Sequence, residues 1–167
     1  MTKTVILVAI SAALAVTPSA RSQPTPVTQA AVVPETSQHA TGPFDVKVAP
    51  QPPEETAGSP SISRMLLDKQ FHGDLEATSK GTMLAAGSGA KGSSGGYVAL
   101  EIVTGSLKGH TGTFVLQHSA TMTRGTPALI ITVVPDSGTG QLVGLTGRMS
   151  IEIANGKHTY IFDYTLP

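Results

Sequence analysis

The chain of 167 residues contains no cysteine and no tryptophan, and only 4% of its residues are aromatic. Without a thiol there is no disulfide, no thiolate nucleophile, no thiolate metal site and no attachment point for a lipoprotein anchor. The hydrophobic core alone must therefore hold the mature protein together. The length is sufficient for one domain of ordinary size.

Charge is scarce as well, since only 13% of the residues are Asp, Glu, Lys or Arg. Eleven basic residues balance eleven acidic ones, and the basic residues form no cluster. A nucleic acid or an anionic membrane surface is therefore not an expected partner. Glycine is abundant, with 18 residues, while stretches suited to a helix are missing, so the composition predicts a β-rich fold with many turns.

The first 22 residues have the pattern of a secretory signal peptide, with cleavage expected before Gln23. Lys3 supplies the positive charge, residues 5–16 are apolar or small apart from Ser11, and small residues stand at Ala20 and Ser22. Twelve apolar residues are too few to span a bilayer comfortably, so an anchor is the weaker alternative. We therefore expect a secreted or periplasmic protein with no membrane span after cleavage.

Residues 23–42 are rich in Pro, Thr, Gln, Ala and Val and contain a single carboxylate, which predicts a disordered linker. The remaining domain, residues 43–167, divides at turn residues into eight expected strands: 44–49, 63–70, 71–85, 97–107, 111–122, 128–134, 148–154 and 157–166. Asn155-Gly156 suits a two-residue hairpin turn, and no connection is long enough for a crossover helix. The sheet should be antiparallel, but the pattern leaves a barrel and a sandwich open.

The glycine-rich loops raise the question of a nucleotide site. Residues 87–92, "GSGAKG", fit the G-x-G-x-x-G pattern of dinucleotide-binding proteins. That fingerprint requires a helix after its third glycine, whereas here another expected strand follows. The segment "PDSGTGQLVGLTG", residues 135–147, lacks the lysine and hydroxyl residue of a P-loop. Both loops are therefore interpreted as bent backbone, not as phosphate sites.

Four segments, "FHGDLEATSKGTML", "GYVALEIVTGSLKGHTGTFVLQH", "VVPDSGTGQLVGLTG" and "GKHTYIFDYTL", resemble the bacterial family of uncharacterised proteins called DUF3224. "GTGQLVGLTG" is also similar to a glycine-bearing segment of plant allene oxide cyclases and dirigent proteins, which lies between two strands of an eight-stranded barrel. The resemblance implies an all-β, eight-stranded antiparallel barrel, in which Gly144 and Gly147 permit bending or close strand approach and Gly138 and Gly140 form a turn. It also implies a homo-oligomer. The cyclase catalytic residues find no match here.

Alternation predicts which side chains face the interior. On residues 113–122, Phe114 and Leu116 share a face with His118, and on residues 157–166 His158 shares a face with Tyr160 and two further aromatics. These five residues are the expected lining of a small-ligand site. The alternative is that the polar ones are buried groups that fix the strand register. Two histidines without a third ligand at a recognisable spacing predict no metal site, and we expect no cofactor.

Glu76 and Glu101 are the candidate proton-transfer carboxylates, and strict alternation places both on the outer face. A bulge would reverse either assignment, and an inward glutamate beside His118 could then move a proton on a bound substrate. His72 and His110 lie in or near turns and should be solvated. The leading hypothesis is a barrel that binds a small, mainly apolar molecule, and the alternatives are an isomerase or cyclase-like enzyme and a self-associating structural module.

Overall fold

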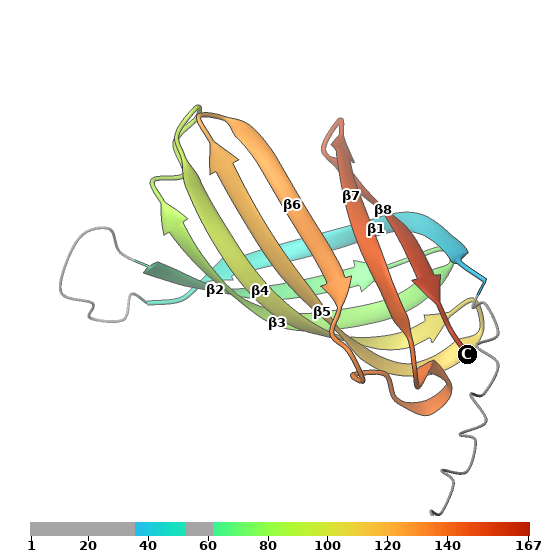
Figure 1. Cartoon of the computed structure of the whole chain (residues 1–167). Helices are drawn as coiled ribbons and strands as arrows, with labels where there is room; N and C mark the ends of the chain where they lie inside the picture. The colour runs from blue at the N-terminus through green and yellow to red at the C-terminus, as the bar shows by residue number, and fades with distance from the viewer. Residues whose placement is uncertain (1–35, 53–61) are drawn as a thin grey trace, which may run out of the picture. The chain divides into compact units, whose positions relative to one another are not determined.

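The computed structural model describes residues 36–52 and 62–167, and in this part of the chain eight strands form one closed antiparallel barrel (Figure 1). Strands pair in chain order, and β1 closes the ring by pairing with β8. The predicted eight-stranded antiparallel barrel is therefore confirmed, and the sandwich is excluded. The strands are β1 (Gln38–Pro50), β2 (Ile62–Phe71), β3 (Leu75–Gly87), β4 (Gly95–Leu107), β5 (His110–Thr123), β6 (Thr126–Val133), β7 (Thr146–Ala154) and β8 (Lys157–Thr165).

The start of β1 differs from the prediction. The linker was expected to run to residue 42, but β1 begins at Gln38, and residues 38–42 pair with β8 from Tyr164 to Tyr160. The segment has little apolar patterning, so its strand state comes from backbone pairing and from the burial of Ala40. The predicted signal peptide lies outside the described residues. No helix in the described ranges is long and apolar enough to cross a membrane.

Three short turns join neighbouring strands as the sequence predicts. Asn155 and Gly156 have φ angles of 52° and 74°, the positive values that a two-residue hairpin turn of this kind requires. In the turn at Lys108-Gly109 and in the turn between β5 and β6, both central residues likewise have positive φ angles. The β5–β6 and β7–β8 turns lie with the β3–β4 loop at one end of the barrel, which we call the open end, whereas the Lys108-Gly109 turn joins β4 to β5 at the other end.

The other end is closed by the glycine segment between β6 and β7, which contains the short 3-10 helix η1 (Gly140–Leu142). Leu142 and Leu145 are 1% exposed and fill the end of the barrel. A Cβ on Gly138 would lie 1.8 Å from the Leu142 carbonyl oxygen, and one on Gly147 would lie 2.6 Å from the Asp163 carbonyl oxygen. The predicted turn and close strand approach are therefore both found, and the segment plugs the closed end.

The same segment completes the wall beside β5, where β6 does not reach. The Thr139 amide donates to the Thr113 carbonyl at 2.8 Å, and the Thr113 amide donates to the Thr139 hydroxyl at 3.0 Å. The Val115 amide donates to the Ser137 hydroxyl at 3.1 Å. These bonds satisfy backbone groups of β5 that a sheet neighbour would otherwise pair.

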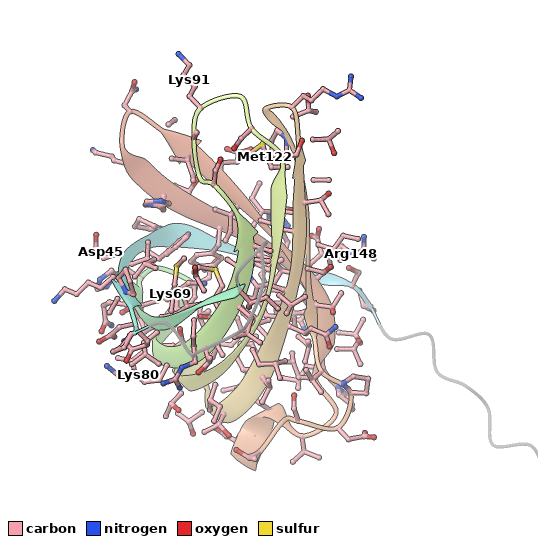
Figure 2. All side chains as sticks on the ribbon, turned by 90° about the vertical axis from the view of Figure 1, so that its left-hand side faces the viewer. Asp45, Lys69, Lys80, Lys91, Met122 and Arg148 are labelled. Atoms are coloured by element: carbon pink, nitrogen blue, oxygen red, sulfur yellow. The ribbon has the colours of Figure 1, made fainter. Side chains whose placement is uncertain are left out.

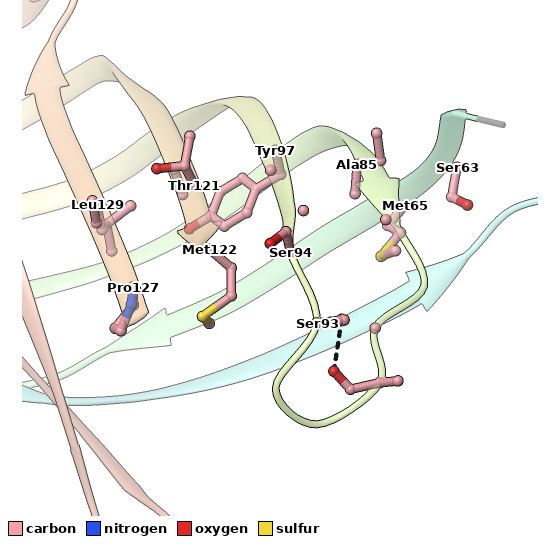
Figure 3. A pocket seen from close by; sticks show the side chains of 18 residues that line it. Ser63, Met65, Ala85, Ser93, Ser94, Tyr97, Thr121, Met122, Pro127 and Leu129 are labelled. Atoms are coloured by element: carbon pink, nitrogen blue, oxygen red, sulfur yellow. Dashed lines mark hydrogen bonds between the residues drawn. The ribbon is translucent and has the colours of Figure 1, made fainter. Parts of the chain in front are cut away.

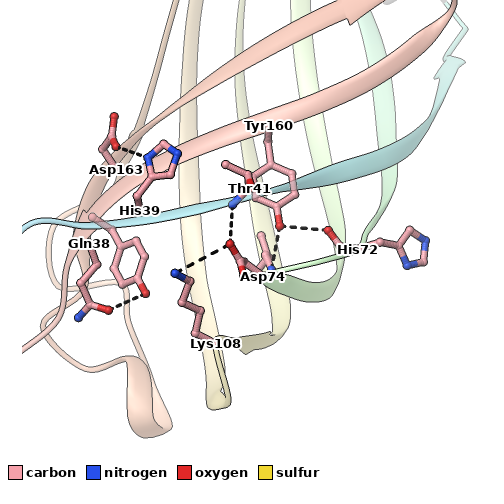
Figure 4. Close-up of polar contacts among 10 residues, drawn as sticks. Gln38, His39, Thr41, His72, Asp74, Lys108, Tyr160 and Asp163 are labelled. Carbon is pink, nitrogen blue, oxygen red and sulfur yellow. Dashed lines mark hydrogen bonds and ion pairs between the residues drawn. The ribbon is translucent and has the colours of Figure 1, made fainter.

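The core is concentrated toward the closed end. The rings of Phe114 and Phe162 stack with centroids 5.9 Å apart, and Phe162 also stacks on Tyr164 at 5.2 Å. The Tyr160 hydroxyl accepts a hydrogen bond from the Leu75 amide (2.8 Å) and donates one to the His72 carbonyl (3.1 Å), which fixes the β2–β3 turn (Figure 4). This half of the barrel is therefore filled by protein side chains.

Toward the open end the wall is incomplete between β6 and β7. These strands share only two residue pairs, Ile131 with Met149 and Thr132 with Arg148, whereas every other neighbouring pair of strands shares at least seven. Beyond those pairs the two strands diverge (Figure 1). The barrel is thus tight at one end and splayed at the other.

Candidate functional site

A cavity of about 400 Å³ lies at the open end. Figure 3 shows it bordered by β2, β3, β4, β5 and β6 and by the β3–β4 loop. Much of its wall consists of alanine and glycine, and Met65, Met122 and Leu129 supply the larger apolar surfaces. This volume is within the range of small-molecule sites. The residues that line it are Ser63, Met65, Ala85, Ala86, Gly87, Gly89, Ala90, Ser93, Ser94, Gly95, Gly96, Tyr97, Ala120, Thr121, Met122, Pro127, Ala128 and Leu129.

Tyr97 is the one lining residue with an aromatic ring, and its side chain lies beside Met122 in Figure 3. It is half-buried, and no hydrogen bond joins its hydroxyl to another described residue. Burial raises the pKa of Tyr97, and the negative charge of Glu101 raises it further. The phenol is therefore a protonated hydrogen-bond donor at neutral pH.

Further into the barrel, Glu101 of β4 is 1% exposed and accepts three hydrogen bonds. Its Oε1 atom accepts from Lys69 Nζ of β2 at 2.7 Å and from His118 Nε2 of β5 at 2.8 Å. Its Oε2 atom accepts from the Ser79 hydroxyl of β3 at 2.7 Å. These four residues, which we call the charged layer, join four consecutive strands. Figure 2 shows Met122 near the open end at the top and Lys69 farther down.

Within the charged layer, the negative charge of Glu101 is offset by its cationic and hydrogen-bonding neighbours. Burial by itself raises the pKa of Glu101, but the hydrogen bond from His118 and the charge and hydrogen bond of Lys69 outweigh it and lower the pKa to about 2. The ammonium of Lys69 also lies 5.5 Å from the ring centroid of Phe44 and 5.7 Å from that of Phe71. Every buried polar side-chain atom in the described ranges has a hydrogen-bond partner.

Gly81 of β3 makes room for this arrangement. It is paired with Glu101 across the two strands, and a Cβ at this position would lie 2.6 Å from the Glu101 Cβ and 2.6 Å from the Leu100 carbonyl oxygen. A residue with a side chain would therefore push β4 away or turn the carboxylate. The glycine inside "SKGTM" is the local sequence feature that allows the glutamate to be buried.

The prediction that Glu101 faces outward is wrong. The alternation on β4 holds, because Val98, Leu100 and Ile102 do face away from Glu101, but they are the outer set, with 54%, 55% and 57% exposure. Both faces of this strand are largely apolar, so its own sequence does not reveal which one is inside. The cation and the imidazole that offset the buried carboxylate come from β2 and β5.

The five predicted ligand-binding residues all face the interior, but the structure does not gather them at one end as expected. His118 is buried and bonded to Glu101, His158 is half-buried with its ring 5.2 Å from that of Phe44, and Tyr160 is used at the closed end. Phe114 and Leu116 belong to the packed core. None of the five lines the open-end cavity, so their ligand-binding role stays a prediction.

Glu76 faces outward, as predicted, and accepts a hydrogen bond from the Gly73 amide at 2.8 Å. His72 and His110 are exposed, also as predicted. Sequence reasoning missed Lys69, Ser79 and Tyr97. Nothing in the sequence of β2 indicates that its lysine is buried. Tyr97 lies on the same face of β4 as Glu101, so it would have been placed inside as soon as Glu101 was.

The charged layer brings a carboxylate and an imidazole together, but it is not built as a strong base. Glu101 is ionised and can only accept, so Nε2 of His118 donates their shared hydrogen bond. A carboxylate with a pKa of about 2 is a weak general base near neutral pH. Among the described residues no group of three metal-ligating side chains gathers.

A second hollow, of about 380 Å³, lies over β3, β4 and β5. Several of its walls are outward-facing side chains such as Leu84, Val98 and Leu100, which are exposed. It is thus a depression of the outer surface. The open-end cavity, which is bordered by inward-facing side chains, is the better candidate for a small-molecule site.

Comparisons with known proteins agree with the observed fold. The family model described as "Protein of unknown function (DUF3224)" matches residues 40–164. A crystal structure of a protein of unknown function from the DUF3224 family of Shewanella oneidensis MR-1 is 47% identical, with a TM-score of 0.73, and the match covers 79% of this chain and 98% of that chain. The comparison with curated proteins gave no match.

Proposed function

The chain belongs to the DUF3224 family, and we propose that it binds a small, mainly apolar molecule in the cavity at the open end of its barrel. The observation that carries this proposal is the cavity of about 400 Å³, walled by small and apolar side chains and containing a phenol whose hydroxyl has no hydrogen-bond partner among the described residues. Sites of this volume, mostly apolar with few polar groups, are the usual form of small-ligand pockets.

The contrast with the rest of the interior supports the proposal. The closed half is filled by large side chains such as Phe71, Phe114 and Phe162. In the cavity the corresponding inward positions are held by Ala85, Ala120 and Gly87. Small residues leave space where the same barrel would otherwise be packed to native density. An unfilled cavity lowers the stability of a protein, so its presence favours a function such as ligand binding.

Binding can be tested with N-phenyl-1-naphthylamine, an uncharged dye whose fluorescence rises in apolar surroundings. The full chain should give a saturable increase. Ala120→Phe, which projects into the cavity, should abolish the increase, whereas Ser119→Phe, the next residue on the outer face, should leave it unchanged. No saturable binding, or equal loss in both variants, would reject the cavity as the site. Native mass spectrometry of protein from its own host would reveal a resident molecule.

Proton transfer on the bound molecule is the second candidate, and the 2.8 Å contact between Glu101 and His118 favours it. His118 does not line the open-end cavity, so this candidate requires a molecule that extends beyond the cavity to the charged layer. Proton NMR of 2-acetylnaphthalene, a neutral aromatic ketone, in D2O would show exchange of its methyl protons. Exchange that the wild type accelerates and His118→Gln does not would favour an enzyme, and no acceleration is expected if the protein only binds.

The likeness of the glycine segment to allene oxide cyclases and dirigent proteins supports a ligand-holding barrel, but it remains a resemblance of one loop. Self-association, export and the signal peptide likewise stay predictions of the sequence.

A further inference from the structure

The tyrosines of the barrel differ in what their hydroxyls do. The Tyr160 hydroxyl bonds to the Leu75 amide and the His72 carbonyl, and the Tyr164 hydroxyl donates to Gln38 Oε1 at 3.0 Å (Figure 4). Tyr97 has no such partner in the part of the chain that the structure describes, and it alone of the three lines the cavity. A half-buried phenol without a partner is a donor available to whatever fills the space beside it.

The described residues that line the cavity carry no charge, because none of them is an aspartate, glutamate, lysine, arginine or histidine. A charged ligand would therefore lose its hydration without gaining a counter-ion, which is unfavourable. An anion is disfavoured further, because burial and then the negative charge of Glu101 raise the pKa of Tyr97, and both effects disfavour a negative charge at this place.

Lys69 is not placed to act as the counter-ion of a ligand. Its ammonium is 2.7 Å from Glu101 Oε1, its side chain is 5% exposed, and it lies over the rings of Phe44 and Phe71. It is not part of the cavity wall. The cation lies against the buried carboxylate and outside the cavity wall, so a ligand anion at Tyr97 would meet an apolar wall without a counter-ion of its own.

We infer that the cavity selects neutral, mainly apolar molecules that carry one hydrogen-bond-accepting oxygen, such as a ketone or an ester, and rejects carboxylates of the same shape. The oxygen would accept the hydrogen bond of Tyr97, and the apolar body would lie against Met65, Met122 and Leu129. This inference rests on the proposed function, since it specifies the chemistry of the molecule that the cavity takes.

Three probes of matched shape test the inference: 2-acetylnaphthalene, which has a ketone; 2-isopropenylnaphthalene, in which a methylene replaces the oxygen; and 2-naphthoate, which is an anion. Calorimetric titration of the full chain should rank their affinities ketone, hydrocarbon, carboxylate. The carboxylate should bind at least about 10-fold more weakly than the ketone. Tyr97→Phe should weaken the ketone about 5-fold and leave the hydrocarbon unchanged.

The outcomes separate this inference from the proposed function. If no probe binds and the dye does not bind either, the proposed function fails. If all three bind alike, or if Tyr97→Phe weakens the hydrocarbon as much as the ketone, the cavity binds molecules but the selectivity is wrong. Tyr97→Phe removes one half-buried hydrogen-bond donor and no apolar surface, and circular dichroism would verify that the variant remains folded.

Discussion

The two halves of the barrel are built from the same strands but differ in what fills them. In the closed half, aromatic rings stack on one another and the glycine segment covers the end with Leu142 and Leu145. In the open half, alanine and glycine face the interior and β6 separates from β7. The charged layer of Lys69, Ser79, Glu101 and His118 is buried within the same barrel. The packing of the closed half therefore stabilises the barrel, and the open half can retain a cavity.

The sharpest test of this comparison is to remove one large apolar side chain from each half. Phe162→Ala deletes a fully buried ring that contacts Phe114 and Tyr164, and it should lower the free energy of unfolding by about 4 kcal/mol. Leu129→Ala, at the rim of the cavity, should cost less than about 1 kcal/mol, because that side chain is 40% exposed. Urea unfolding followed by circular dichroism measures both. Equal costs would show that the two halves are packed alike.

The charged layer should make the next largest contribution. Glu101→Gln leaves the Lys69 ammonium buried without its counter-ion, and we expect a loss of about 3 kcal/mol at pH 7. Glu76→Gln, on the outer surface, is the control and should change the free energy of unfolding by less than about 0.5 kcal/mol. A fully stable Glu101→Gln protein would mean that the buried carboxylate is not needed to offset Lys69.

The same carboxylate predicts how stability depends on pH. The pKa of Glu101 is lowered from 4.5 to about 2 in the folded protein, so its contribution is present above pH 4.5 and is lost as the pH falls toward 2. The wild type should therefore lose more stability between pH 5 and pH 3 than Glu101→Gln does. Urea titrations at the two pH values provide the difference. A drop of the same size in both proteins would assign the acid sensitivity to other carboxylates.

A smaller effect distinguishes two tyrosines. Tyr160→Phe leaves the buried Leu75 amide without its acceptor and should cost about 1–3 kcal/mol. Tyr97→Phe removes a hydroxyl with no partner among the described residues, so it should leave the thermal midpoint nearly unchanged. If both substitutions destabilise equally, the Tyr97 hydroxyl serves the fold and is not reserved for a ligand.

The wall itself should differ between the halves without any substitution. Amides of β6 and β7 beyond their two shared pairs should exchange hydrogen faster than those of β3 and β4, which share thirteen. Hydrogen exchange measured by mass spectrometry resolves the strands. Uniform protection around the barrel would contradict a splayed open end.

Much of the fold was accessible from the sequence because turns and alternation are local signals. Asn155-Gly156 fixed a hairpin, and the polar outer face of β5 placed His118 inside. The failures concern long-range pairing. Glu101 is buried because Lys69 and His118 meet it from other strands, and residues 38–42 are strand because β8 lies beside them. The segment of residues 135–147 was expected to bend, but its role as a plug depends on what it covers.

The central claim is that the open half receives a small neutral molecule while the closed half stays packed, and the methionines report on both. Met65 and Met122 line the cavity, whereas Met149 is buried in the core. In a titration of protein labelled with ¹³C at its methionine methyls, 2-acetylnaphthalene should shift the Met65 and Met122 signals saturably and leave Met149 in place. No saturable shift at Met65 and Met122, or an equal shift at Met149, would contradict the account.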